Sequence, residues 1–378
     1  MRKVAVITGT RADYGIVYPV LKAIDECSEL ELRLIVTGMH YIEDLGYTVE
    51  QILKDGFRIS FEGWVHIAAD IGEDMANEFG MYVSEMAQAL YNLKPDWLIV
   101  LGDRGEMLAG AIVATHMGIP VIHLQGGDVT TGACIDEPIR HSITRFAHLH
   151  FPSTEQSANR LVKMGEELWR VQVVGPLGIY AMPEVEFTPE IELRRDLGIA
   201  NDKPIVLVVQ HPVTTQIDQA PEQMRATLEA VSSVQSVQSV IIYPNSDAGG
   251  REMIKVIEKY PQIRSFKSLP YLTFLSLLKA SSVLVGNSSV ALLEAPLFGI
   301  PVVNIGDREK GREIFGVVYN VFEFKSPIIA AAIGLALFGK KLNGTKVPKR
   351  STSGVTKIIK ALIETPIDAR LLQKRLSY

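Results

Sequence analysis

Short apolar runs rich in β-branched residues alternate along the chain with longer segments in which apolar residues recur at helical spacing. The runs of the first half are VAVITG, LRLIVTG, WLIVLGD, PVIHLQGG, LHFPS and VQVVG. Those of the second half are IVLVVQHP, SVIIYPNS, SSVLVGNSS and PVVNIG. Such alternation predicts repeated βαβ units and parallel sheets. Most runs end in residues that permit tight turns, so we expect loops, and any ligand, at the carboxyl ends of the strands.

The two sets of predicted strands are separated by PLGIYAMPEVEFTPE, a segment with three prolines and little periodicity. We place the domain junction there, with one Rossmann-like domain over residues 1–176 and a second over 177–354. The fold class is therefore α/β, with two parallel-sheet domains facing a central cleft, the glycosyltransferase-B type of architecture. By analogy with that architecture, the closing segment 355–378 is expected to pack back on the first domain.

Composition narrows the class of protein. Hydrophobic residues make up 47% of the 378 residues, so each half can bury a core, and a net charge of −5 argues against a nucleic-acid partner. Two cysteines, Cys27 and Cys134, cannot build a disulfide framework. A strand predicted from Lys3 leaves no room for a signal peptide, and the most apolar stretch, 328–338, is too short to span a bilayer. We expect a cytoplasmic protein with no membrane partner, and a buried helix over 328–338.

Candidate chemistry in the first half begins at the turn TGTRADYG. This turn places Arg11 and several backbone amides between a strand and a helix, where they can cradle a diphosphate. It lacks both the GxGxxG spacing and the lysine of a P-loop, so a simple surface turn is the alternative. Farther on, Asp103 and Arg104 follow a strand of apolar residues. They are either a solvated loop end or a functional pair that faces the cleft.

The segment from His123 to His150 is rich in ionisable side chains, among them Asp128, Asp136, Glu137, Arg140 and His141. Pro138 favours a helix that starts near Asp136. Carboxylates and an imidazole beside a cleft suit proton transfer, whereas a helix cap with structural ion pairs is the alternative. The eight histidines show no HExxH or other recognised ligand spacing, so we expect no metal.

In the second half, His211 stands at a strand end, where it either contacts a phosphate or caps the loop. The run GNSSVALLE predicts a helix start with small polar residues, which suits a diphosphate, and a later Glu294 that can accept hydrogen bonds from ribose hydroxyls. An ordinary cap at Ser288 is the alternative. The segment NIGDREKGRE follows another strand, and one of its arginines, Arg308 or Arg312, should reach the cleft.

In this order, TGTRADYG, LGDR, GGDV, IDEPIRH, QHPVTT, YPNSD, GNSS and NIGDREKGRE make the chain resemble the UDP-N-acetylglucosamine 2-epimerase family over nearly its full length. The hydrolysing branch fits better, because the non-hydrolysing branch typically has Pro-Glu after the opening GTR. The resemblance implies that UDP leaves C1 while a base takes the C2 proton. Water then adds to the glycal and yields free N-acetylmannosamine for sialic-acid-type sugars. It also implies no metal or redox cofactor, and a homodimer or homotetramer.

The resemblance also assigns site residues. Asp103 and Asp136 resemble the acid–base carboxylates, and His40 a cleft residue close to the sugar. Gln125 stands where the family has a glutamate, and an amide cannot accept a proton as a carboxylate does. Either Asp128 takes over that step, or Gln125 orients water or substrate, or the chemistry differs. The expected UDP-sugar contacts are Arg11, Gly15, Arg104, Arg140, His141, His211, Asn245, Gly286, Asn287, Ser288, Ser289, Glu294 and Arg308.

Several alternatives remain at this stage. The substrate could carry two acetamido groups, as UDP-N,N'-diacetylbacillosamine does, and the enzyme could interconvert two UDP-sugars without hydrolysis. A glycosyltransferase of the same architecture would need an acceptor, and a non-catalytic UDP-sugar sensor would show no turnover.

Overall fold

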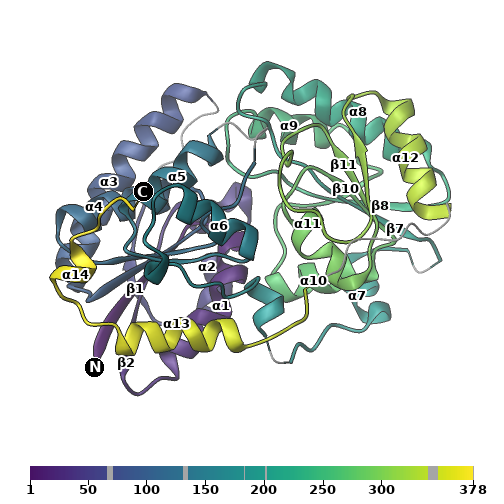
Figure 1. The fold of residues 1–378 in the computed structure, drawn as a ribbon. Coiled ribbons are helices and arrows are strands. Elements are labelled where there is room, and N and C mark those ends of the chain that lie inside the picture. Colours follow the sequence, from purple (N-terminus) through teal and green to yellow (C-terminus); the bar gives the residue numbers. More distant parts are fainter. Residues whose placement is uncertain (66–70, 131–134, 183, 201, 339–347, 378) are drawn as a thin grey trace.

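The computed structural model describes residues 1–65, 71–130, 135–182, 184–200, 202–338 and 348–377. Within this part, the chain forms two six-stranded sheets with helices on their faces, and every strand pair is parallel (Figure 1). The predicted fold class, two Rossmann-like sheets of the glycosyltransferase-B type, is confirmed.

The first sheet has the order β3-β2-β1-β4-β5-β6. Its strands are β1 (Arg2–Thr8), β2 (Leu30–Val36), β3 (Ile59–Glu62), β4 (Trp97–Leu101), β5 (Val121–Leu124) and β6 (Leu149–Phe151). Its α-helices are α1 (Arg11–Asp25), α2 (Val49–Lys54), α3 (Gly72–Leu93), α4 (Gly105–His116), α5 (Asp136–Phe146) and α6 (Glu155–Lys163). The 3₁₀ helices are η1 (Gly38–Tyr41), η2 (Glu43–Leu45), η3 (Leu168–Arg170) and η4 (Gly178–Ala181), the last in the connection to the second sheet.

The second sheet has the order β12-β11-β10-β7-β8-β9. Its strands are β7 (Ile205–Val209), β8 (Gln238–Ile242), β9 (Arg264–Phe266), β10 (Val283–Gly286), β11 (Val302–Ile305) and β12 (Val318–Val321). The helices with it are α7 (Glu190–Leu197), η5 (Ile217–Gln219), α8 (Ala220–Ser233), α9 (Gly250–Ile257), α10 (Tyr271–Ala280), α11 (Val290–Leu293), η6 (Ala295–Phe298) and α12 (Ser326–Phe338). The chain ends with α13 (Ser353–Glu364) and α14 (Ala369–Leu372).

Strand order locates the place where a ligand can bind. In the first sheet, β2 and β3 are added on one side of β1 and the later strands on the other, so the order of addition reverses between β1 and β4. In the second sheet the same reversal lies between β7 and β10. At such switch points the loops that follow adjacent strands diverge and leave a crevice at the carboxyl edge. The crevices here are bordered by the residues that follow β1, β4, β7 and β10, and these include Arg11, Asp103, His211 and Ser288.

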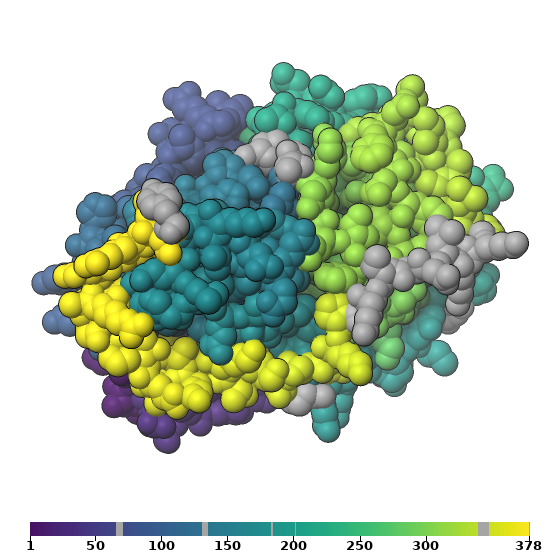
Figure 2. Space-filling view, in the orientation of Figure 1, coloured from purple at the N-terminus to yellow at the C-terminus, as the bar shows by residue number. Residues whose placement is uncertain are grey.

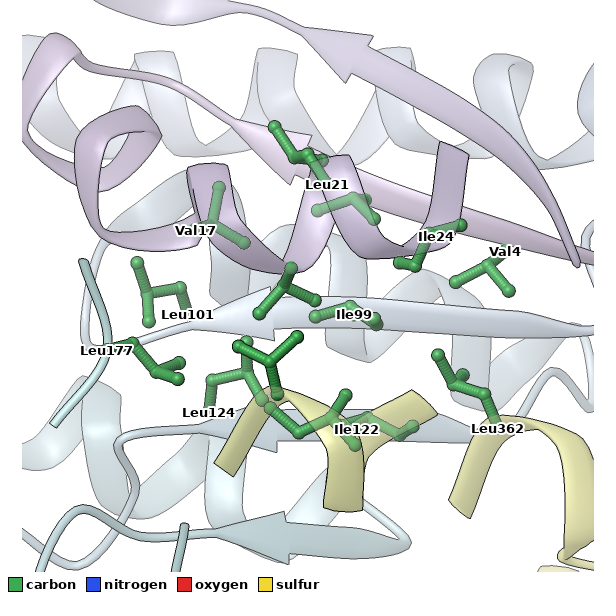
Figure 3. Close-up of a cluster of buried hydrophobic side chains, with 14 of the residues drawn as sticks. Val4, Val17, Leu21, Ile24, Ile99, Leu101, Ile122, Leu124, Leu177 and Leu362 are labelled. Atoms are coloured by element: carbon green, nitrogen blue, oxygen red, sulfur yellow. The ribbon is translucent and has the colours of Figure 1, made fainter. Parts of the chain in front are cut away.

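The C-terminal segment returns to the first sheet. Val355, Ile358 and Leu362 of α13 are buried in the same hydrophobic cluster as β1, β4, β5 and α1, and Figure 3 shows Leu362 beside Ile122 and Ile99. The Arg2 guanidinium donates to the carbonyl of Leu362 at 2.7 Å. Figure 2 shows this segment, in yellow, lying across the surface of the first half of the chain.

Four strand assignments and one helix differ from the sequence predictions. VQVVG was predicted as a strand, but only Val171 pairs, through an isolated bridge to His150. The strands β3, β9 and β12 were not predicted, because each has only three or four residues and is partly exposed. The helix predicted over 328–338 forms, yet only one side of it is buried, and Leu335 and Phe338 are 57% and 69% exposed.

No helix in the described part of the chain combines the length and the apolar character that crossing a membrane requires. Cys27 packs against the first core, while Cys134 lies outside the described residues.

Candidate functional site

A cavity of about 220 Å³ lies between the two halves of the chain, at the carboxyl edges of both sheets. Loops after β1, β4 and β5 and the start of α5 line it from the first half. Loops after β7, β8, β10 and β11 line it from the second. Thirteen of the predicted site residues border this cavity: Arg11, Asp103, Arg104, Gln125, Asp128, Asp136, Arg140, His211, Asn245, Ser288, Ser289, Glu294 and Arg308.

Five predicted residues lie outside the cavity lining. Gly15 packs against the ring of Tyr271, since a Cβ built on it would lie 2.3 Å from a ring carbon. Gly286 has φ +140° and would bring a Cβ within 2.0 Å of the Val209 carbonyl, so only glycine fits there. His141 is one-third exposed and bonds Glu137. The remaining two, His40 and Asn287, lie directly behind lining residues.

His40 is buried behind the cavity rather than in it. Its Nε2 lies 3.0 Å from the Thr8 hydroxyl, which itself donates to Asp13, so Nε2 must carry the proton. Its Nδ1 lies 2.8 Å from the Thr48 hydroxyl. Burial lowers the pKa of His40 to about 3, which keeps the ring neutral. Through Thr8, His40 therefore fixes the orientation of Asp13.

The start of α1 differs from the expected anion cradle. Thr10 caps the helix, and its side chain accepts from the N–H of Asp13 in a capping box. The Asp13 carboxylate accepts from the N–H groups of Gly9 and Thr10, both at 2.9 Å. The amides of Gly9, Thr10 and Asp13 are therefore used within the protein, whereas Arg11 and Ala12, the first two residues of the helix, line the cavity.

Two carboxylates, Asp103 and Asp136, stand at one end of the cavity in opposite electrostatic environments. Burial raises the pKa of Asp103, but Arg140, Arg312 and Arg308 lower it more, so the net pKa lies below its usual range. Burial, helped by the negative charge of Asp103, raises the pKa of Asp136 to about 7, against the opposing charge of Arg308. A pair of acids whose pKa values are pushed apart is typical of acid–base sites.

Arg140 organises this end of the cavity. Its guanidinium has five N–H donors, and all five are used within the protein. Two donate to Asp103, two to the side chains of Glu137 and Thr130, and one to the carbonyl of Asp128. The sequence assigned Arg140 to substrate binding, but the structure leaves no donor on it for a substrate anion. It holds Asp103 in place instead.

Ion pairs join the two halves of the chain inside the cavity. Arg308, in the loop after β11, donates to Asp136 at 3.1 Å, and its other amino group bonds Glu309 at 2.8 Å. Arg104 lies 3.8 Å from Asp247 of the second half. Arg308 and Arg104 are therefore already opposed by carboxylates of the protein.

His211 is held in one protonation state. Its Nδ1 accepts from the N–H of Asn245 at 3.1 Å, so the proton of the neutral ring is on Nε2. Burial, with the charges of Arg308 and Arg104, lowers the pKa of His211 well below its usual value. The side-chain amide of Asn287 bonds both the N–H and the carbonyl of His211, at 2.7 and 2.9 Å. His211 thus offers an N–H donor beside Ser288, whose hydroxyl lies 3.3 Å away.

The cavity also contains a buried cation, Arg11, and a buried acid, Glu294. The Arg11 guanidinium lies 4.5 Å from the centre of the Phe274 ring. Burial lowers the pKa of Arg11, against the charge of Glu294. Burial likewise raises the pKa of Glu294, against a hydrogen bond from Tyr271 and the charge of Arg11. Among the described residues, Arg11 has no hydrogen-bond acceptor within the protein.

Two further polar groups of the cavity have unused hydrogen-bonding capacity. Ser289, not Ser288, is the N-cap of α11, and its side chain makes no capping bond. The Asn245 side-chain oxygen is buried without a hydrogen-bond partner in the described part of the chain. Buried polar groups normally have partners, so this oxygen is a candidate acceptor for a ligand hydroxyl or N–H.

Gln125 and Asp128 line the cavity beyond β5. Gln125 has φ +60°, a left-handed conformation that is uncommon outside glycine and often marks functional sites. Asp128 accepts a hydrogen bond from the Ser157 hydroxyl at 2.8 Å.

Sequence reasoning missed several lining residues, among them Asp13, Tyr271 and Phe274, and it also missed Asp247, which lies 3.8 Å from the lining residue Arg104. The Thr-x-x-Asp spacing at Thr10 could have revealed Asp13 as part of a capping box. The sequence does not mark Tyr271 or Phe274 as site residues, because both lie in an apolar helix whose residues are expected to pack in the core.

Comparisons with known proteins agree with this geometry. The family model described as UDP-N-acetylglucosamine 2-epimerase matches residues 22–354. UDP-N,N'-diacetylbacillosamine 2-epimerase (hydrolyzing) of Legionella pneumophila is 36% identical over 83% of this chain and 83% of its own. UDP-N-acetylglucosamine 2-epimerase of Neisseria meningitidis is 32% identical over 86% and 85%. A crystal structure of UDP-GlcNAc 2-epimerase from Neisseria meningitidis bound to UDP-GlcNAc has a TM-score of 0.78 at 18% identity, covering 96% of this chain and all of that one, which shows the shared fold.

Proposed function

Because the chain belongs to the UDP-N-acetylglucosamine 2-epimerase family, we propose that it is a hydrolysing 2-epimerase. It converts UDP-N-acetylglucosamine and water into UDP and free N-acetylmannosamine, a precursor of sialic-acid-type sugars. The observation that carries this proposal is the carboxylate pair, Asp103 and Asp136, in one cavity with Arg11, His211 and Arg308. Such a set can neutralise a leaving diphosphate and accept a proton from the neighbouring carbon.

In the first step the C1–O bond breaks and its electron pair leaves with UDP. Because no carbonyl acidifies the C2 proton, departure of UDP runs ahead of proton removal and the ring becomes positively charged. Asp136, whose raised pKa makes it the stronger base of the pair, takes the C2 proton as the C1–C2 double bond forms. Ionised Asp103 stabilises the positive charge on the ring.

In the second step water adds to the glycal. Its hydroxyl bonds C1, and a proton from solvent reaches C2 on the face opposite to the one that lost it, while the proton held by Asp136 returns to solvent. Asp128, held by Ser157, accepts the proton of the water, and Gln125 orients that water. Asp128 thus supplies the carboxylate that the amide of Gln125 cannot provide.

Departure of UDP needs positive charge that acts more strongly in the transition state than in the ground state. Arg11, the Nε2–H of His211, and the hydroxyls of Ser288 and Ser289 bind the diphosphate. Arg308 joins them, although in the ligand-free protein it pairs with Asp136. As the diphosphate engages Arg308, Asp136 loses its cation, so its pKa rises and it becomes a stronger base.

A second candidate substrate is UDP-N,N'-diacetylbacillosamine. The observation that favours it is the likeness to the Legionella pneumophila relative, which is named for that substrate and is 36% identical to this chain. The two candidates share the chemistry at C1 and C2. They differ at C4, which carries a hydroxyl in one and an acetamido group in the other, and at C6, which is a hydroxymethyl group in one and a methyl group in the other.

The test is a product assay by NMR on purified protein, with each UDP-sugar supplied separately and no acceptor. We expect UDP and a free 2-epimeric sugar from one of them. A product that keeps its UDP would show a non-hydrolysing epimerase. Consumption only after an acceptor is added would show a glycosyltransferase, and binding without turnover would show a sensor.

A further inference from the structure

Tyr271 is the first residue of α10 and lies where the two halves of the chain meet. Its side chain is almost fully buried, at 6% exposure. Its ring packs against α1 so closely that a Cβ on Gly15 would lie 2.3 Å from a ring carbon. Packing therefore fixes the orientation of the ring and the position of its hydroxyl.

That hydroxyl makes two hydrogen bonds. It accepts from the N–H of Ile179 at 3.2 Å and donates to Oε1 of Glu294 at 3.2 Å. Burial, with the charge of Glu294, raises the pKa of Tyr271 well above 10, so the phenol keeps its proton and remains a donor. Gly178 approaches the same hydroxyl, since a Cβ there would lie 2.8 Å away.

The acceptor, Glu294, lines the cavity, and the charge of the lining residue Arg11 acts on it. A carboxylate has about four lone-pair positions. Tyr271 uses one of them, which leaves capacity for two hydroxyl donors of a ligand. Without Tyr271 the buried carboxylate would be free to rotate, and a bidentate contact with neighbouring hydroxyls would lose its fixed geometry.

The connection between the domains makes two hydrogen bonds close to Glu294. Besides the Ile179 N–H on Tyr271, the Tyr180 hydroxyl donates to the carbonyl of Leu293 at 2.6 Å. Both residues belong to η4, and Leu293 immediately precedes Glu294. The orientation of Glu294 is thus set by the interdomain connection as well as by its own helix.

We propose that Tyr271 is a positioning residue that holds Glu294 for recognition of the ribose diol of the nucleotide. This inference rests on the proposed function, because it takes the ligand to be a UDP-sugar. Tyr271 does not touch the reacting atoms, so it should govern affinity for the nucleotide far more than the chemical step.

The test compares UDP with 2′,3′-dideoxy-UDP by isothermal titration calorimetry on the full chain. Hydrogen bonds to charged groups contribute enough that Tyr271→Phe should weaken UDP binding ~10-fold. The same variant should change the Kd of dideoxy-UDP less than ~2-fold, because that ligand has no diol for Glu294 to bind. In turnover, KM should rise by a similar factor to the UDP Kd while kcat changes little.

Tyr91→Phe is the control, since Tyr91 on α3 is 70% exposed and its phenol hydroxyl lies outside the cavity lining and the contacts of Glu294. It should leave the ratio of the two Kd values at its wild-type value. Glu294→Gln gives an independent arm that keeps the Tyr271 ring, and it should abolish the preference for UDP over the dideoxy ligand. A Glu294→Gln protein that keeps the preference would overturn the inference.

Unchanged UDP binding by Tyr271→Phe, or an equal loss on both ligands, would also overturn it while leaving the proposed function intact. Diol-dependent binding without release of free sugar would contradict the proposed function and support the inference. A wild-type protein that binds no UDP would contradict both.

Discussion

Two sets of charged and polar groups in the cavity differ in how they are partnered. Around Asp103 and Asp136, the guanidinium groups bond the protein's own acids. All five N–H donors of Arg140 bond acceptors within the protein. Among the groups proposed to bind the nucleotide, Arg11 is buried over an aromatic ring, and the Asn245 side-chain oxygen has no partner in the described part of the chain. The first set is organised before any ligand arrives, and the second is completed by the ligand. Substitutions around Asp103 and Asp136 should therefore change the rate of the chemical step. Substitutions among the proposed nucleotide contacts should change the affinity for the nucleotide.

The largest effect is expected from Asp136→Asn. Removal of the base should lower kcat by ~10³-fold or more, the upper part of the range for general base catalysis. UDP should still bind with a Kd within ~3-fold of wild type. Kinetics of UDP release, with calorimetry, measure both quantities.

The exposed carboxylate Asp196, 58% accessible on α7, gives a control. Asp196→Asn should leave kcat and Kd at wild-type values. A kcat for Asp136→Asn near that of the control would remove Asp136 from the mechanism.

Among the proposed nucleotide contacts, Arg11→Gln should weaken UDP binding ~30-fold, since charge-assisted hydrogen bonds to phosphate are strong when desolvated. The kcat at saturating substrate should fall much less than in Asp136→Asn. Calorimetry with UDP measures the loss, and Arg195→Gln on exposed α7 is the control. A Kd for Arg11→Gln equal to that of the control would contradict the assignment of Arg11.

The pH dependence tests the carboxylate pair alone. Asp136 must be ionised to accept the proton, so kcat/KM should fall as pH drops below about 7. Asp103→Asn removes a negative charge that raises the pKa of Asp136, so the acidic limb should move to lower pH. Arg308→Gln removes a cation that lowers the same pKa, so the limb should move to higher pH. Profiles of kcat/KM for the three proteins measure this, and shifts in the same direction would refute the assignment.

The smallest expected effect is an increase in the affinity for UDP, in contrast to the decrease expected for Arg11→Gln. Asp247 lies 3.8 Å from Arg104 and competes with a ligand anion for it. Because a pair of this length contributes at most ~1 kcal/mol, Asp247→Asn should tighten UDP binding by ~2–3-fold. Weaker binding, measured by the same titration, would indicate that Asp247 supports the ligand through Asn245, to which it is bonded at 2.6 Å.

The sequence located the site well, because βαβ periodicity determines which residues follow the strands. Arg11, Asp103, His211 and Ser288 were expected at one edge, and all four line one cavity. The strand prediction failed where segments are short or partly exposed, as for β9 and for VQVVG. Such segments carry little of the apolar signal from which strands are recognised.

What the sequence could not give is how each donor and acceptor is used. Arg140 bonds Asp103, 37 positions away in the chain, so its full engagement is visible only in three dimensions. His40 is of a residue type common in catalytic sites, but it lies behind Thr8. Tyr271 reads as core from its helical position, although its hydroxyl reaches Glu294. Side-chain partnerships of this kind depend on tertiary distances that residue patterns do not encode.

The proposed mechanism, in which UDP leaves C1 as Asp136 takes the C2 proton, is tested most directly by turnover of UDP-N-acetylglucosamine in D₂O, followed by NMR. We predict UDP and free N-acetylmannosamine with one solvent deuterium at C2, and neither product from Asp136→Asn. Free N-acetylglucosamine with protium at C2 would mean simple hydrolysis at C1 and would contradict the proposal.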